Sequence, residues 1–273
     1  MQQLMTGDKE VQRLRREIRA TRRELDVYRA SLERELELAA KVHRSLLPDP
    51  IRDPRINVDV RYIPIEQVGG DYCQVRFADP ETFFINICDV TGHGIGPALL
   101  ATRVSSEVRY GILYGRSPRE IVRCLNRFIY DHFDETDLYL SFVVARIDLW
   151  RRSITWCGAG HPSPLLIRGD GTSVEQLESR NPLIGIFKDV LDDEPEGTLE
   201  LHCGDRLIFY TDGIFEVNDA EGRQLGTSGL ARIAAESKSL DLFESADHIL
   251  DRVAQFNHGP ITDDRTLIVA EIP

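Results

Sequence analysis

Aspartates stand beside apolar, strand-like runs at four separate places in the sequence. Asp89 lies near the end of "FFINICDV", and Asp212 follows "RLIFY" and precedes a glycine. Asp263 and Asp264 come directly before "RTLIVAEI", and Asp71 follows the paired glycines of "VGGDYCQV". One Asp next to a glycine is common in turns, but a carboxylate beside a buried strand is costly unless it is paired or binds a metal. Four such places together indicate a shared site.

Carboxylates on separate strands can converge at one edge of a β-sandwich. Close carboxylates raise one another's pKa unless cations neutralise them. Oxygen ligands without a Cys or His set suit hard cations, here magnesium or manganese. Two such ions about 4 Å apart can share and deprotonate a water and stabilise charge on a phosphoryl group. The aspartates therefore predict a two-cation site for phosphate chemistry.

Glycines follow Asp89 in "DVTGHGIG", at Gly92, Gly94 and Gly96. Glycine lets the backbone come close enough for a carbonyl or an amide to reach a metal or a phosphate. A nucleotide-binding P-loop is the alternative, but no Lys-Ser/Thr follows the glycines. The loop also lacks the strand-helix-strand setting of a dinucleotide fold, so we interpret it as part of the cation site.

Composition narrows the class of protein. The 273 residues carry a net charge of -12 and 42% hydrophobic residues, which suits one large globular domain with an appendage. The acidic balance argues against nucleic acid as a partner. The five cysteines include no CxxC pair, which argues against a disulfide framework or a zinc site. No secretory signal is present and no run approaches the roughly 18 apolar residues of a membrane span. We therefore expect a soluble, cytoplasmic protein that binds neither nucleic acid nor membrane.

The N-terminal segment has a seven-residue repeat. Residues 8–47 are polar, and they contain no proline or internal glycine. One seam consists of Val11, Ile18, Leu25, Leu32, Ala39 and Leu46, and a weaker one of Leu14, Thr21, Tyr28, Glu35 and Val42. Such a repeat predicts a coiled coil, so residues 1–47 are expected to form a regulatory helix that makes a homodimer. The alternative is a long helix folded back on its own domain.

Prolines end the N-terminal segment, and short strand-like and helical patterns follow in the rest of the chain. Pro48, Pro50 and Pro54 end the helix, so residues 48–54 are interpreted as a linker and 55–273 as the catalytic domain. The predicted strands lie within 56–65, 83–90, 138–149, 152–160, 164–169, 205–213 and 265–272, and the predicted helices near 96–114, 118–133, 228–236 and 242–256. Many strands with clustered helices favour an α+β fold, an antiparallel β-sandwich flanked by helices.

Six ordered motifs resemble those of bacterial PPM-type metal-dependent serine phosphatases of the RsbU/SpoIIE branch. They are "VGGDYCQV", "ICDVTGHGIGPALLA", "WCGAGHPSPLLI", "PLIGIF", "LIFYTDGIFEV" and "TDDRTLIVAEI", and the resemblance covers about residues 55–273. It implies a dinuclear manganese or magnesium site and hydrolysis of phosphoserine or phosphothreonine on a protein. In this branch that protein is typically a STAS-domain anti-sigma-factor antagonist, within a partner-switching pathway. The lead-in helices commonly dimerise and carry a signal from an upstream sensor or activator.

The resemblance also assigns roles to residues. Asp89 matches the metal-bridging aspartate, and the carbonyl of Val90 matches the backbone ligand beside it. Asp212 matches the ligand of the second metal. Asp263 matches the remaining ligand, with Asp264 beside it as a further candidate. Catalysis is accordingly expected to depend on Asp89, Asp212 and Asp263.

Other matches are less direct. Asp71 matches an upstream acid that acts through metal-bound water, and Gln74 stands where the family often has another acid. His93 lies four residues after the aspartate rather than two, as in eukaryotic relatives, so we assign it no proton-transfer role. His161 is expected to close a turn before Pro162.

Two candidates for a phosphate-binding cation are Arg103 and Arg265, and Glu216 is expected to pack or cap beside Asp212. One rival reading is a catalytically weak or inactive scaffold that binds the same partners through the stalk and the phosphatase fold. Another is a different two-metal hydrolase, but such enzymes generally use histidine ligands, and the seven histidines here show no paired metal spacing.

Overall fold

A computed structural model describes residues 2–92, 94–136, 138–171, 173–189 and 196–273 of the chain. The chain divides into two compact units, Met1–Val42 and His43–Pro273. This division bears on packing alone, so the limits of the coiled coil, linker and catalytic domain stay predictions. Among the described residues, no helix is both long and apolar enough to cross a bilayer.

The N-terminal repeat forms one long helix, α1, at Gln2–Arg44. Its polar sequence and its lack of internal proline allow the helix to run unbroken until just before Pro48. Side chains of both predicted seams are exposed on it, among them Ile18 at 65% and Tyr28 at 68%. The helix is thus confirmed, while dimerisation through its seams stays a prediction.

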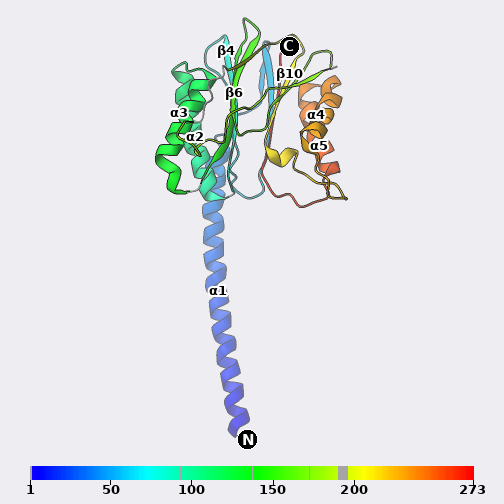
Figure 1. The fold of residues 1–273 in the computed structure, drawn as a ribbon. Helices are drawn as coiled ribbons and strands as arrows, with labels where there is room; N and C mark the ends of the chain where they lie inside the picture. The colour runs from blue at the N-terminus through cyan, green and yellow to red at the C-terminus, as the bar shows by residue number, and fades with distance from the viewer. Residues whose placement is uncertain (1, 93, 137, 172, 190–195) are drawn as a thin grey trace. The chain divides into compact units, whose positions relative to one another are not determined.

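The second unit contains two sheets whose strands pair antiparallel (Figure 1). In the six-stranded sheet the order is β1 (Ile51–Asp53), β2 (Ile56–Ile63), β11 (Arg265–Glu271), β10 (Arg206–Tyr210), β7 (Leu165–Ile167) and β8 (Val174–Gln176). In the five-stranded sheet it is β3 (Tyr72–Phe77), β4 (Thr82–Val90), β5 (Leu140–Asp148), β6 (Ser153–Ala159) and β9 (Gly197–Glu200). The predicted antiparallel sandwich is confirmed.

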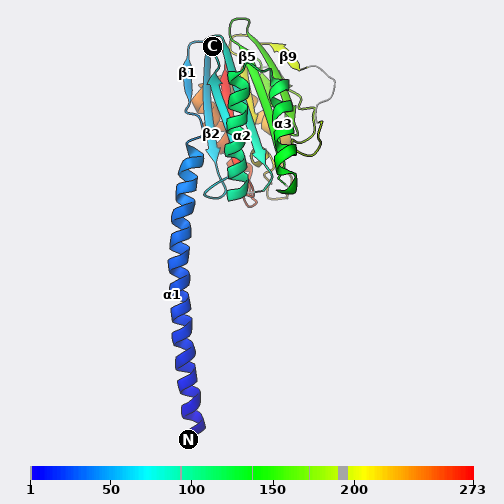
Figure 2. The ribbon, with the colours of Figure 1, turned by 90° about the vertical axis from the view of Figure 1, so that its left-hand side faces the viewer.

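Helices cover both outer faces of the sandwich (Figures 1 and 2). Contacts join α2 (Ile95–Leu113) and α3 (Pro118–Phe133) to the five-stranded sheet, and α4 (Gly226–Glu236) and α5 (Leu242–Phe256) to the six-stranded one. Short 3-10 helices are η1 (Asp134–Thr136), η2 (Asp212–Ile214) and η3 (Ser237–Ser239). The capping box expected at α3 is present: the Ser117 amide donates to Glu120 Oε2 at 2.8 Å and the Glu120 amide to Ser117 Oγ at 3.3 Å.

Strand β4 is buried on both of its faces. Ile85 and Ile87 point into the core between the sheets, whereas Phe84 and Cys88 pack in the core under α2 and α3. This explains why its sequence is apolar at six of nine positions, on both faces, rather than at alternate positions only. The result is a rigid strand whose last two residues are Asp89 and Val90.

Four strands were not predicted from the sequence. Three of them, β1, β8 and β9, have only three or four residues and are too short to show a period. The fourth, β3, is an edge strand that pairs only with β4 among the described strands, and it carries the half-buried Gln74 and Arg76. An edge strand tolerates polar side chains, so its apolar pattern is weak.

Substitution Ile85→Ala should lower the free energy of unfolding by about 2–5 kcal/mol, because it leaves a cavity between the sheets. Leu99→Ala on α2 is a matched control, because Leu99 is exposed, and it should change stability by no more than about 0.5 kcal/mol. Urea unfolding of both variants measures the difference. Equal losses would contradict the assignment of the core.

Candidate metal centre

The structure brings all the aspartates selected from the sequence to one end of the sandwich. Asp89 lies at the end of β4, and Asp212 begins η2 just after β10. Asp263 and Asp264 directly precede β11, and Asp71 directly precedes β3. Pairing of Tyr72 with Cys88 and of Tyr210 with Leu267 sets these strand ends side by side within each sheet.

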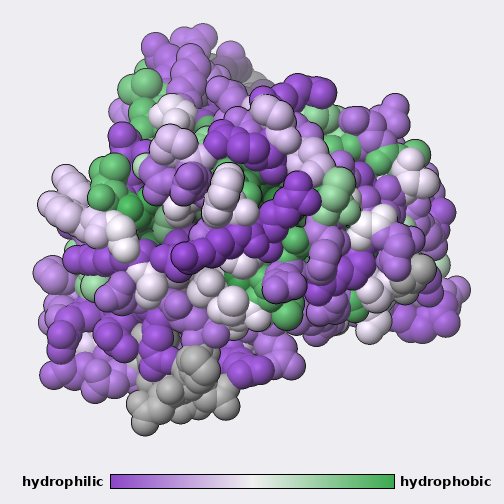
Figure 3. Space-filling model, turned by 90° about the horizontal axis from the view of Figure 1, so that it is seen from above, coloured by the Kyte–Doolittle hydropathy of each residue, from purple (hydrophilic) through white to green (hydrophobic). Residues whose placement is uncertain are grey.

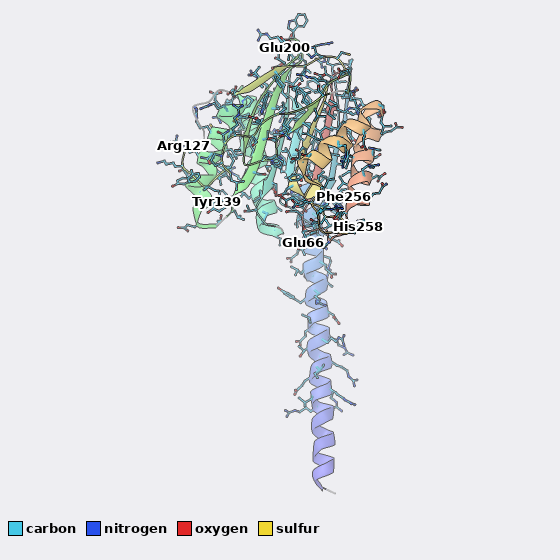
Figure 4. All side chains as sticks on the ribbon, turned by 45° about the vertical axis from the view of Figure 1, so that its right-hand side comes forward. Glu66, Arg127, Tyr139, Glu200, Phe256 and His258 are labelled. Carbon is cyan, nitrogen blue, oxygen red and sulfur yellow. The ribbon has the colours of Figure 1, made fainter. Side chains whose placement is uncertain are left out.

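Figure 4 labels residues that lie near this end of the domain and at the opposite end. Tyr139, whose carbonyl accepts from the amide of Thr91 at 2.9 Å, lies toward the same end of the domain as Glu66. Glu200 of β9 lies at the opposite end. Viewed onto that opposite end, the surface is mainly hydrophilic, with scattered apolar residues (Figure 3).

The carboxylates at this end of the domain interact electrostatically. Burial, together with the charges of Asp212, Asp263 and Asp264, raises the pKa of Asp89 to about 8. Burial and the charges of Asp263 and Glu216 raise the pKa of Asp212 to about 6. Like charges in a partly desolvated place oppose one another's ionisation. A cation bound at this end of the domain would offset that repulsion and favour the ionised carboxylates.

Asp264 is committed to the protein backbone. It is buried, and its two oxygens accept hydrogen bonds from the amides of Ile65 and Gly70, both at 2.8 Å. Gly69 allows this approach, because a Cβ at that position would stand 1.9 Å from Asp264 Oδ2. Asp264 thus fixes the loop of residues 65–70, and each of its oxygens already accepts a hydrogen bond from the backbone.

Asp263 is the better candidate of the pair for a cation. It is half-buried, its Oδ1 accepts a hydrogen bond from the Asp264 amide at 2.8 Å, and its charge raises the pKa of both Asp89 and Asp212.

Val90 is buried at the end of β4, and its amide donates to the Gly70 carbonyl at 3.4 Å. Gly92, which follows, has φ 84°, a left-handed conformation that turns the chain sharply away from the site.

Asp71 lies deeper than the other aspartates. It is 1% exposed, and burial and the nearby Asp89 raise its pKa well above the usual range. Its Oδ2 accepts hydrogen bonds from the hydroxyls of Thr211 and Thr266, whereas its Oδ1 has no hydrogen-bond partner. It therefore lies behind the other carboxylates rather than among them.

A cleft of about 510 Å³ opens beside these aspartates. Its lining residues are Asp89, Thr91, Ser141, Gly160, His161, Pro162, Ser163, Leu183, Asp212, Phe215, Glu216 and Thr227. None of them is Lys or Arg. Negative and neutral polar groups thus line the cleft, so a bound anion such as phosphate would need cations to hold it.

The two arginines selected from the sequence are not in this lining. Arg103 forms an ion pair with Glu107 at 2.7 Å and lies over the ring of Phe128. Arg265 is half-buried, and its Nε has no hydrogen-bond partner. Neither residue is placed to grip a ligand in the cleft as it stands.

Three further sequence candidates have different outcomes. Glu216 is exposed in the cleft lining, and its amide donates to the Asp212 carbonyl at 2.8 Å. Gln74 lies on β3, paired with Asn86. His93 lies outside the described residues.

A Ser–His pair at the cleft was not expected. His161 is buried, and its Nδ1 lies 2.7 Å from Ser141 Oγ. Burial lowers the pKa of His161 to about 3, so the ring is neutral. Ser141 pairs with Asp89 across β4 and β5. The sequence signal that could have indicated it is a serine inside an otherwise apolar strand.

The donors present fit hard cations. All candidate side chains supply oxygen, which magnesium and manganese prefer. Asp212 Oδ1 and Asp71 Oδ1 are buried without a hydrogen-bond partner, an arrangement that costs energy unless another group binds them. In the part of the chain that the structure describes, no three Asp, Glu, His or Cys side chains form a set that could hold a metal as they stand. Binding would therefore require these mutually repelling side chains to draw together.

Known proteins are similar to this chain in sequence and in fold. Residues 79–273 match the family described as Stage II sporulation protein E (SpoIIE). Phosphoserine phosphatase RsbP of Bacillus subtilis (strain 168) is 30% identical over 192 residues, which cover 69% of this chain and 47% of RsbP. Phosphoserine phosphatase RsbU of the same organism is 25% identical over 236 residues, which cover 86% of this chain and 69% of RsbU.

A solved structure shows the same architecture. The SiaA-PP2C domain of Pseudomonas aeruginosa superposes with a TM-score of 0.79 at 20% identity, over 90% of this chain and 98% of that domain. The fold is therefore that of a PP2C-type phosphatase domain. With most of its length matched, the chain belongs to the SpoIIE family. It spans about half the length of RsbP.

Asp89→Asn should stabilise the metal-free protein at neutral pH, because burial and the charges of Asp212 and Asp263 oppose an ionisation that is free in the unfolded chain. One pKa unit corresponds to about 1.4 kcal/mol, so a gain of about 1 kcal/mol, or about 2–4 °C in Tm, is expected. We expect manganese to raise the Tm of the wild type, and this rise should disappear in the variant. Asp251→Asn on the exposed face of α5 is the control. A drop in metal-free Tm for Asp89→Asn alone would contradict the repulsion.

Proposed function

We propose that this chain is a metal-dependent phosphatase that hydrolyses phosphoserine or phosphothreonine on a partner protein. The observation that carries the proposal is the mutual electrostatic influence of Asp89, Asp212 and Asp263 at one end of the sandwich. The two relatives named as phosphoserine phosphatases support the choice of substrate class.

The residues divide the work by position. Asp89 interacts with both Asp212 and Asp263, so it would contact both cations. The Val90 carbonyl would be a further ligand next to it. Asp212 and Asp263 would each complete one cation's ligands. Two bound cations supply an activated water and neutralise charge on the phosphoryl group. Asp264 holds the loop of residues 65–70 in place through two backbone amides.

The lining of the cleft supports phosphate recognition through cations. Because none of the described residues that line it is Lys or Arg, the affinity for a phosphorylated side chain would come from the cation pair. Thr91, Ser141 and Ser163 offer neutral hydrogen-bonding groups beside the phosphate position. We propose a STAS-domain anti-sigma-factor antagonist as the partner, acting in the cytoplasm within a partner-switching pathway, on the strength of the sequence resemblance.

We further propose that α1 forms a parallel homodimer and receives a signal from an upstream sensor or activator. Exposed apolar side chains at seven-residue spacing, including Ile18, Leu25 and Leu32, support it. An inactive scaffold that binds the same partners is the second candidate. Asp212 and Asp71 each have a buried oxygen without a hydrogen-bond partner. These oxygens favour the enzyme, because they cost stability and an inactive scaffold would gain nothing from them.

The protein with manganese should release phosphate from a phosphoserine-bearing STAS protein, measured by loss of the phosphorylated band and by free phosphate. EDTA should abolish the release, and excess manganese should restore it. Asp89→Asn should lower the rate at least about a hundredfold, because the residue would contact both cations. Asp251→Asn should match the wild type. Activity that survives both EDTA and Asp89→Asn would sink the proposal.

Light scattering tests the stalk separately. The full chain should have the mass of a dimer at micromolar concentration, and the double variant Ile18→Asp, Leu25→Asp should be monomeric because charges replace both seam residues. Substitution of Arg22 and Arg29, which are exposed outside both seams, by Asp is the matched control. A monomeric wild type would contradict the proposed dimer but would not bear on the proposed phosphatase activity.

A further inference from the structure

Three buried polar side chains from different parts of the chain meet behind the candidate metal centre. They are Asp71 before β3, Thr211 between β10 and η2, and Thr266 in β11. The two threonines have no exposed surface, and Asp71 has 1%. We call this group the Asp–Thr–Thr hub.

Hydrogen bonds close the hub on itself. The hydroxyls of Thr211 and Thr266 both donate to Asp71 Oδ2, at 2.9 and 2.5 Å. The Thr266 amide donates to Thr211 Oγ1 at 3.0 Å, and the Thr211 amide donates to the Thr266 carbonyl at 3.1 Å. Thr211 Oγ1 is thus donor and acceptor at once. Each threonine hydroxyl has a fixed partner, as buried hydroxyls require.

The hub lies one to three residues from the candidate ligands. Thr211 directly precedes Asp212, and Thr266 lies three residues after Asp263. Asp71 follows Gly70, whose amide binds Asp264 Oδ2. A shift of any one of these three segments would therefore move a candidate ligand or the loop that faces it.

The hydroxyls themselves call for an explanation. Valine has nearly the same shape as threonine and fits β-strands well, and it would need no buried hydrogen bond. The two buried threonines converge on one oxygen of Asp71, and they tie the end of β10 and the strand β11 of one sheet to the residue just before β3 of the other. Backbone pairing between β10 and β11 alone cannot provide that link between the sheets.

We propose that Thr211 and Thr266 are positioning residues that act through Asp71 to hold the segments of Asp212 and Asp263 beside each other, so that their carboxylates can draw together around a cation pair. This inference rests on the proposed function. It gives Asp71 a role through Oδ2 that is distinct from ligation, and it leaves Oδ1 as the one oxygen of Asp71 still able to reach a water of the cation site.

Manganese binding by the full chain, measured by titration calorimetry, tests the hub without relying on catalysis. Thr211→Val and Thr266→Val keep the shape but remove the donor, so each should weaken manganese binding about 10–100-fold, as groups behind metal ligands do. Thr211→Ser and Thr266→Ser keep the hydroxyl and should bind within a few-fold of the wild type. Thr155→Val and Thr155→Ser are the controls and should leave manganese binding unchanged. Thr155 lies on β6, where it pairs with Thr198 of β9.

Asp71 provides a second test that does not depend on the valine variants folding. Asn at position 71 retains a carbonyl oxygen that can accept both hydroxyl bonds, whereas Ala retains none. Asp71→Asn should therefore keep much more manganese affinity than Asp71→Ala. Equal losses in these two variants would overturn the hub, and so would valine variants that bind manganese like the wild type.

The steady-state rate separates positioning from a general loss of fold. In the valine variants the manganese concentration for half-maximal phosphate release should rise, while the rate at saturating manganese approaches that of the wild type. A lowered rate with unchanged manganese dependence would contradict the inference. A wild-type protein that binds no manganese would instead overturn the proposed function itself, so the two failures are distinguishable.

Discussion

Repulsion between Asp89, Asp212 and Asp263 is the interaction around which this domain is arranged. The three carboxylates come from three separate segments. Burial raises the pKa of Asp89 and of Asp212, the charges of Asp212 and Asp263 raise that of Asp89 further, and the charge of Asp263 raises that of Asp212. Nothing local would keep such groups together, because each segment could relax by moving its carboxylate into water. The remainder of the fold must therefore hold the strand ends in place against this repulsion.

The sandwich supplies that restraint in layers. Strand β4 is packed on both faces, between the second sheet and helices α2 and α3, so Asp89 ends a rigid element. Strands β10 and β11 pair along five residues of each strand and place Asp212 beside the segment of Asp263. Asp264 and Asp71 then tie the loops and the two sheets together through buried hydrogen bonds. Charge, packing and hydrogen bonding thus act on the same few residues.

Much of this followed from the sequence because the relevant signals are local. Short windows of the sequence show the largely apolar run of β4, the capping box of Ser117 and Glu120, and the aspartates beside strands. Other features depend on partners far apart in the chain. Ser141 faces Asp89 only because of the strand register, and Thr211 and Thr266 matter only because Asp71 reaches both. Threonine in a strand is ordinary, so its sequence gives no hint of the hub. Asp264 shows the limit clearly, since only its two backbone partners separate its role from that of Asp263.

The same arrangement explains why the cleft can be acidic and still suit a phosphorylated substrate, since cations would reverse its charge. The most direct measurement is anomalous X-ray scattering from crystals of the full chain grown with manganese. We predict two manganese peaks among the carboxylates of Asp89, Asp212 and Asp263, with the three side chains drawn toward them. An ordered structure with those carboxylates apart and no manganese between them, at a concentration that supports phosphate release, would contradict the central claim.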